Sequence, residues 1–170
     1  DNVIDVDTQT TVTMAVVDND SDDNFDSVSD QTVTVTTTDN DTAGFTLSST
    51  TATVTEAAGG GNTATYTVVL NAQPDSDVVI SVTSADTGEV TVSSGTLTFT
   101  NANWNNAQTV TLTGVDDNVI DVDTQTTVTM AVVDNDSDDN FDSVANQTVT
   151  VTTTDNDTAA FTLGAISGTV

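Results

Sequence analysis

Residues 1–47, DNVIDVDTQTTVTMAVVDNDSDDNFDSVSDQTVTVTTTDNDTAGFTL, occur a second time at residues 117–163 with only three changes. Those changes are Ser29 to Ala145, Asp30 to Asn146 and Gly44 to Ala160. Near-identity over this length marks a duplicated unit. The offset of 116 residues between the copies is the length of a domain, whereas solenoid repeats have periods of about 20–50 residues. The sequence therefore predicts a tandem array of domains.

The repeat divides the chain into three parts. We expect one complete domain at residues 44–159. Residues 1–43 then form the C-terminal part of a preceding repeat, and residues 160–170 begin the next one. Because the pattern is already under way at its first residue, we expect the chain to be an excerpt of a longer array.

Within the repeat, apolar residues alternate with Thr and Ser. A period of two turns one face of a strand inward and the other outward, and Thr suits the outward positions of a sheet. Eight or nine such runs separated by turn signals predict an all-β, Ig-like antiparallel β-sandwich, with the lone Trp104 capping its core. In chain order the runs centre on residues 45–47, 54, 64–70, 78–82, 90–92, 97–99, 110–112, 128–132 and 149–151.

The charge of the chain is entirely negative. It has 27 acidic residues and no Lys, Arg or His, and all the acids except Glu56 and Glu89 are Asp, a residue typical of turns. A net charge of −27 with no internal cation destabilises a compact state by self-repulsion. An acidic surface of the halophile kind would spread these acids, but here they occur in short runs. That clustering favours bound divalent cations, which would also stabilise a chain without cysteines.

The same composition argues against several function classes. Nucleic-acid binding needs Lys or Arg for the phosphates. No apolar run approaches the roughly 18 residues of a membrane-spanning helix, so we expect no direct membrane insertion. Without His, Cys or Lys the chain lacks the usual bases and nucleophiles, and we expect no enzyme. A carboxylate pair of the glycosidase kind stays open as an alternative, although dense clusters suit a cation better.

The acids lie between the predicted strands. Calcium takes six to eight oxygen ligands, whereas zinc prefers His and Cys, and the DNDSDD run lacks the Gly and the final Glu of an EF-hand. The alternative is that Asp and Asn only form turns here. The candidate ligands in the complete repeat are Glu56, Asp86, Asp116, Asp117, Asp121, Asp123, Asp134, Asp136, Asp138, Asp155 and Asp157. Those in the preceding copy are Asp1, Asp5, Asp7, Asp18, Asp20, Asp22, Asp39 and Asp41.

Three stretches, VTEAAGGGNTATYTVVLN (54–71), GTLTFTNANWNNAQTVTLTGVDDNVIDVD (95–123) and VTVTTTDND (149–157), resemble the Calx-beta domain. More specifically, they resemble the Calx-beta-like tandem repeats of large bacterial surface and secreted adhesins. This resemblance implies a sandwich of seven or slightly more strands that binds calcium at one end. The matching acids are Glu56, Asp86, Asp116, Asp117, Asp121, Asp123, Asp155 and Asp157, with Asn156 in place of the middle acid of the last triplet.

The resemblance also implies a function. We expect a secreted or cell-surface module, stabilised by Ca²⁺, that builds a rod or filament of an adhesin or matrix fibre. Its partners would be neighbouring repeats, with lateral or head-to-tail self-association into fibres. Two alternatives remain open at this point: a calcium-sensing regulatory module, and a surface that binds a ligand such as a glycan or ice.

Overall fold

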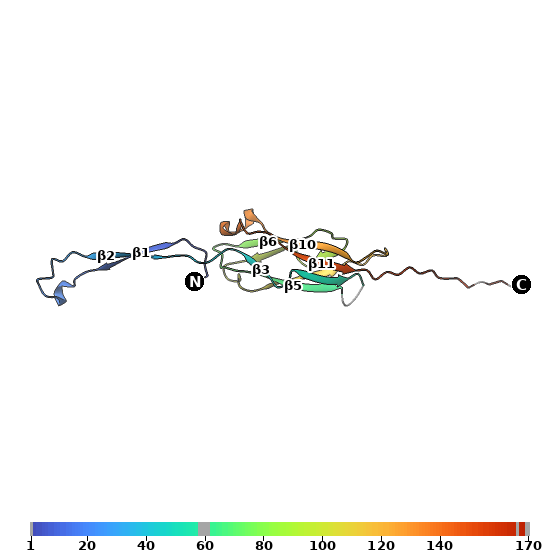
Figure 1. Ribbon diagram of the computed structural model, residues 1–170, viewed down its shortest axis with the longest axis horizontal. Coiled ribbons are helices and arrows are strands. Elements are labelled where there is room, and N and C mark those ends of the chain that lie inside the picture. Colours follow the sequence, from blue (N-terminus) through green and yellow to red (C-terminus); the bar gives the residue numbers. More distant parts are fainter. Residues whose placement is uncertain (1, 58–61, 166, 169–170) are drawn as a thin grey trace.

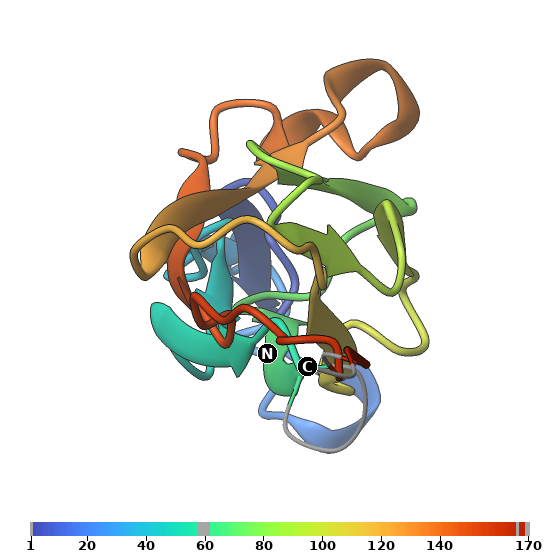
Figure 2. The same cartoon turned by 90° about the vertical axis from the view of Figure 1, so that its right-hand side faces the viewer.

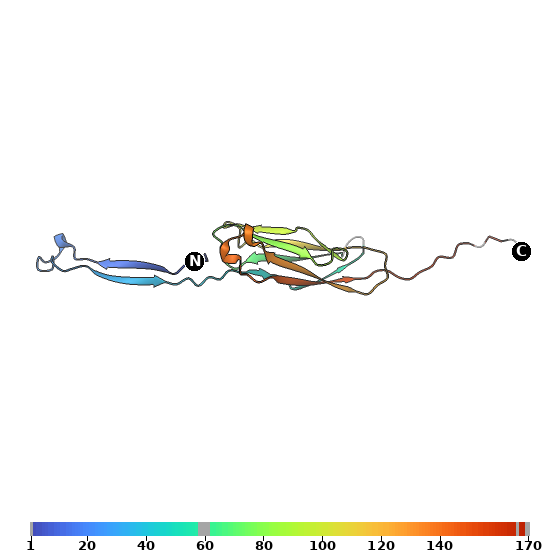
Figure 3. The same ribbon diagram turned by 90° about the horizontal axis from the view of Figure 1, so that it is seen from above.

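The computed structural model describes residues 2–57, 62–165 and 167–168. A β-hairpin, a β-sandwich and an extended C-terminal segment follow one another along a single long axis (Figures 1 and 3). The two ends of the sandwich therefore have different neighbours. One end meets the hairpin, and the C-terminal segment leaves from the other.

In the described part of the chain the sandwich contains nine strands in two sheets, which confirms the predicted all-β, Ig-like fold (Figure 2). The five-stranded sheet has the order β4 (Thr51–Thr55), β11 (Gln147–Thr154), β10 (Thr124–Val132), β6 (Val78–Ser84) and β8 (Thr96–Phe99). The four-stranded sheet has the order β3 (Phe45–Leu47), β5 (Thr63–Leu70), β9 (Gln108–Gly114) and β7 (Val90–Val92).

All strand pairs of the sandwich are antiparallel except one. Strands β4 and β11 run parallel, with Thr51 opposite Thr150 and Thr55 opposite Thr154. The predicted antiparallel β-sandwich is thus confirmed with one exception, the β4–β11 pair. Because parallel strands end at the same edge of a sheet, the acids that follow β4 and β11 emerge side by side.

The core follows the predicted alternation. Inward residues of both sheets are buried, while Thr and Ser fill most outward positions, as a half-buried strand requires. Trp104 is half-buried and packs against this core, in agreement with its predicted capping role. None of the described strands contains a charged residue, so every acid of the described residues lies in a connection between strands or beyond them.

The repeated sequence forms the same hairpin twice. Strands β1 (Thr8–Met14) and β2 (Gln31–Thr37) pair in the register of β10 and β11, displaced by the repeat offset. In the sandwich this hairpin lies between β4 and β6, and Met130 of β10 is fully buried, where its Sδ atom accepts a hydrogen bond from the Tyr66 hydroxyl of the other sheet at 3.0 Å. The β1–β2 hairpin has no such neighbouring strands among the described residues, and its counterpart Met14 is 53% exposed.

The described residues contain three helices, each a single 3₁₀ turn: η1 (Asp18–Asp20), η2 (Asp134–Asp136) and η3 (Asp139–Phe141). Phe141 of η3 is fully buried, which anchors the long β10–β11 connection to the core. Among the described residues, no helix has the length and apolar character needed to cross a membrane.

Candidate metal centre

One end of the sandwich gathers carboxylates from several connections. Glu56 follows β4, and Asp155 follows its parallel neighbour β11. At Gly114, the last residue of β9, an added Cβ would lie 2.4 Å from the backbone oxygen of Thr55. Only glycine allows this approach, which brings the end of β9 onto the end of β4. Asp116 and Asp117 follow β9 directly, so the fold delivers them to the same end.

At this end three carboxylates converge. Glu56, Asp155 and Asp157 each offer an oxygen atom, and these atoms lie within 4.8 Å of one another. Glu56 is only 3% exposed, and its Oε2 atom has no hydrogen-bond partner in the described structure. The Oδ2 atom of Asp157 is also buried without a partner. Burying a carboxylate oxygen without a partner is costly, which makes these atoms candidates for contact with a bound ion.

The negative charges around Glu56 also favour a bound cation. Burial raises the pKa of Glu56, and the negative charges of Asp117 and Asp121 raise it further, followed by Asp155 and Glu89. Burial also raises the pKa of Asp157, again with added repulsion from neighbouring acids. Since the chain has no basic side chain, nothing within it offsets this repulsion. A bound divalent cation would reverse it, because the ion becomes the largest local charge.

The backbone of the terminal acidic triplet holds the carboxylates in place. Asp157 N donates to Asp155 Oδ1 at 2.8 Å, and Asp155 N donates to Asp123 Oδ1 at 3.3 Å. Asn156 Nδ2 donates to Asp116 Oδ1 at 3.4 Å. Through these contacts Asp116 and Asp123 orient the triplet. The donor set is rich in oxygen and lacks nitrogen and sulfur, as calcium prefers.

Glu89 belongs to this acidic end but was not among the predicted ligands. It precedes β7, and its backbone oxygen accepts a hydrogen bond from Val115 N at 2.9 Å. Its Oε2 atom is buried without a partner. Burial raises the pKa of Glu89, and the charges of Asp121, Asp86 and Asp117 raise it further, which links Asp86 to the group. Composition could have pointed to Glu89, because Glu89 and Glu56 are the only glutamates in the chain.

The DNDSDD run lies at the opposite end of the sandwich. Asp138 is 4% exposed there, and its Oδ2 atom accepts hydrogen bonds from the backbone N–H groups of Asp75 (2.7 Å) and Ser76 (3.0 Å). Burial alone would raise the pKa of Asp138, but these bonds and others from the backbone lower it overall. Asp138 thus fastens the β5–β6 connection. Asp134 and Asp136 are exposed in η2 and join no compact group of acids among the described residues.

The first copy reproduces the local geometry of the triplet. Asp41 N donates to Asp39 Oδ1, and Asp39 N donates to Asp7 Oδ1, both at 3.0 Å. No third acid completes a compact group with Asp39 and Asp41 in the described residues.

The other candidates of the first copy are more scattered. Asp5 is exposed before β1, and Asp20 and Asp22 are exposed at the hairpin tip, where Asp22 accepts a hydrogen bond from Asn24 N. Asp1 and the side chain of Asp18 lie outside the described residues.

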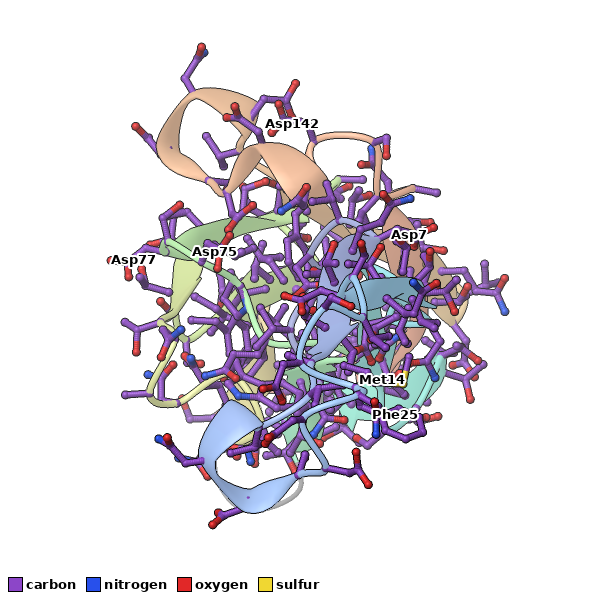
Figure 4. All side chains as sticks on the ribbon, turned by 90° about the vertical axis from the view of Figure 1, so that its left-hand side faces the viewer. Asp7, Met14, Phe25, Asp75, Asp77 and Asp142 are labelled. Atoms are coloured by element: carbon purple, nitrogen blue, oxygen red, sulfur yellow. The ribbon has the colours of Figure 1, made fainter. Side chains whose placement is uncertain are left out.

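At the end of the sandwich that meets the hairpin, the described acids form no compact group of three. Viewed along the long axis from the hairpin side, Asp75 and Asp77 lie apart from Asp142, and all three lie apart from Asp7 (Figure 4). The predicted ligands are thus spread over the hairpin and both ends of the sandwich. Among the described residues, only the C-terminal end of the sandwich holds a compact group of acids, in which Glu56 is buried and Asp155 and Asp157 are partly buried.

Comparisons with known proteins support the fold. No protein-family model matches the chain, and no curated protein matches it. Among solved structures, domains 4 and 5 of the S-layer protein SbsC are similar, with a TM-score of 0.51 and 21% identity over 88% of this chain and 59% of that one. The apo-form Calx CBD1 domain is similar with a TM-score of 0.50 and 15% identity, over 69% of this chain and 100% of that domain. At these identities the likeness shows a shared β-sandwich fold.

Proposed function

We propose that this chain is an extracellular, calcium-stabilised repeat module of a rod or filament on a bacterial surface. The observation that carries the proposal is the buried Oε2 atom of Glu56, which lies beside Asp155 and Asp157 and has no hydrogen-bond partner among the described residues. The chain also has no Lys, Arg or His to balance these charges. The Calx-beta resemblance supports calcium as the ion. The similarity to S-layer domains supports a place at the cell surface.

In this proposal Glu56, Asp155 and Asp157 are the primary ligands. Asp117, Asp121 and Glu89 lie within electrostatic reach and would add ligands or balance the charge of one or more ions. Zinc does not fit a site built only from oxygen donors. Magnesium fits less well, because it keeps most of its waters and demands strict octahedral geometry.

Calcium binding at this site would stabilise the fold by mass action. Extracellular calcium modules typically have Kd values of about 10⁻⁴–10⁻³ M. At a calcium concentration of about 10 mM, a single site of this affinity raises the free energy of unfolding by about 1.4–2.7 kcal/mol. In the predicted array this site would lie where one repeat passes into the next, so the same ion would also stiffen the connection.

The repeat itself supplies a matched test of this proposal. Asp155→Asn and Asp39→Asn alter the same local sequence, but only Asp155 lies beside Glu56. We expect calcium to raise the melting temperature of the wild type and of D39N, and to leave that of D155N almost unchanged. Calorimetric titration should give the corresponding Kd. An equal calcium response in D155N and D39N would contradict the proposed ligands, and a micromolar Kd would favour a calcium sensor instead.

The outward faces of the sheets favour a second candidate, a ligand-binding surface. Threonines form cross-strand rows there, such as Thr51, Thr150 and Thr127, with no charged side chain in the strands. Uncharged hydroxyl rows could contact a glycan or ice. Glycan-array binding and ice-recrystallisation assays test this candidate, and negative results in both would remove it.

A further inference from the structure

The N-terminal segment of the chain docks on the sandwich that follows it. Gln73 N, in the β5–β6 connection, donates a hydrogen bond to Asn2 O at 2.7 Å. Val3 forms a parallel β-bridge with Gln73, and Ile4 is half-buried and packs against the core of the sandwich. The end of the hairpin is thus attached to the next domain by backbone pairing and an apolar contact, in addition to the covalent link.

The receptor for this segment is held firmly by its own side chains. Gln73 Nε2 donates to the backbone oxygen of Asn101 (3.0 Å) and to its Oδ1 atom (3.1 Å), and Asn101 Nδ2 donates to Pro74 O at 3.1 Å. Asp138 fastens the same connection from the other side through its bonds to Asp75 and Ser76. Asp138 of the DNDSDD run therefore helps to hold the connection on which the N-terminal segment docks.

The same docking segment recurs at the far end of the sandwich. Residues 118–120 are again Asn-Val-Ile, at the repeat offset from residues 2–4. There Val119 is 58% exposed and Ile120 is 56% exposed, whereas Ile4 is partly buried on its receptor. Phe161 shows a parallel contrast, because it is 86% exposed while its counterpart Phe45 is 3% exposed in the core.

We infer that Asn118–Ile120 is a docking element for the Gln73 connection of a further copy of this repeat. The joint would reproduce the contacts already made by Asn2–Ile4. The inference rests on the tandem arrangement of the proposed function. It does not rest on calcium, because a backbone hydrogen bond, a β-bridge and an apolar side chain make the contact.

The first test uses the 170-residue chain and a matched pair of substitutions. Ile4→Asp places a charge in the docked contact, and Ile120→Asp places the same charge in the exposed copy. Amide hydrogen exchange followed by NMR should show Gln73 protected in the wild type. We expect I4D to speed exchange at Gln73 about tenfold or more and I120D to leave it unchanged. If I4D unfolds the sandwich, the milder Ile4→Ser replaces it.

Two results of the first test would contradict a contact between Asn2–Ile4 and the Gln73 connection. One is that the Gln73 amide is not protected from exchange in the wild type. The other is that I120D and I4D reduce its protection equally.

The second test extends the chain so that residues 44–159 follow Ala159 once more. The amide that corresponds to Gln73 in the added copy should now be protected, and I120D should remove that protection. Protection that persists in I120D would overturn the inference. Both experiments are run in calcium and in EDTA. Protection in both conditions supports the joint even if the calcium proposal fails, whereas protection that requires calcium would overturn a joint made by protein contacts alone.

Discussion

Replacing Glu56 by Gln should change stability in opposite directions with and without calcium. Gln preserves the shape of the buried side chain but removes its charge. In EDTA that charge is repelled by Asp117, Asp121, Asp155 and Glu89, so we expect E56Q to melt at a higher temperature than the wild type. In calcium the same substitution removes a primary ligand.

The size of the calcium effect follows from the expected affinity. A gain of about 1.4–2.7 kcal/mol at about 10 mM calcium corresponds to a rise of about 3–11 °C in melting temperature for a chain of this length. E56Q should lose most of that rise. Differential scanning calorimetry of both proteins, in EDTA and in calcium, gives the four melting temperatures needed. The reasoning is refuted if E56Q keeps the full calcium response, or if it melts below the wild type in EDTA.

Three further predictions follow from the fold and the site. Burial, reinforced by neighbouring acids, raises the pKa of Glu56 and Glu89 above the ordinary 4.5. In EDTA the folded chain therefore binds protons more tightly than the unfolded chain, and the free energy of unfolding should rise as the pH falls from neutrality toward 4.5. Calcium should reverse this slope, and urea unfolding across the range checks both signs. Met130→Ala should lower the free energy of unfolding by about 2–5 kcal/mol because Met130 is fully buried. Met14→Ala in the exposed hairpin should lower it much less. Equal losses of free energy in urea unfolding would contradict the difference in packing. Gly114→Ala should destabilise the sandwich and weaken calcium binding, because the new Cβ would lie 2.4 Å from the backbone oxygen of Thr55. Calorimetric titration measures the affinity. Unchanged stability and affinity would show that the close contact between the ends of β9 and β4 is not needed.

The strands were predictable because their signal is local. A period of two in Val, Leu and Phe against Thr records which side chains are buried, and nine observed strands match the predicted runs. Strand order carries no such signal. The parallel pairing of β4 with β11 joins Thr51 to Thr150, residues far apart in the chain, so alternation within either strand could not reveal it.

The acids were predictable as residues but not as groups. Asp138 and Asp155 occur in runs of similar composition, yet Asp138 fastens a connection through its bonds to Asp75 and Ser76. Asp155 instead lies, partly buried, in a compact group with the buried Glu56. The difference arises from which end of the sandwich each loop reaches. That depends on strand direction and on the close approach at Gly114, neither of which is written in local spacing.

The distribution of charge connects the site, the joint and the array. The described strands are uncharged, so the acids are concentrated in the loops at the two ends, which are the surfaces where successive repeats would meet. Like charges oppose that end-to-end contact. The observed joint at Gln73 avoids the problem because Asn2, Val3 and Ile4 are all uncharged. Negative charges do lie next to the matching segment Asn118–Ile120. It is flanked by Asp117 and Asp121, which belong to the candidate metal centre. A cation bound there would remove the repulsion just where the docking element is presented, which makes calcium and the neutral contact complementary parts of one connection.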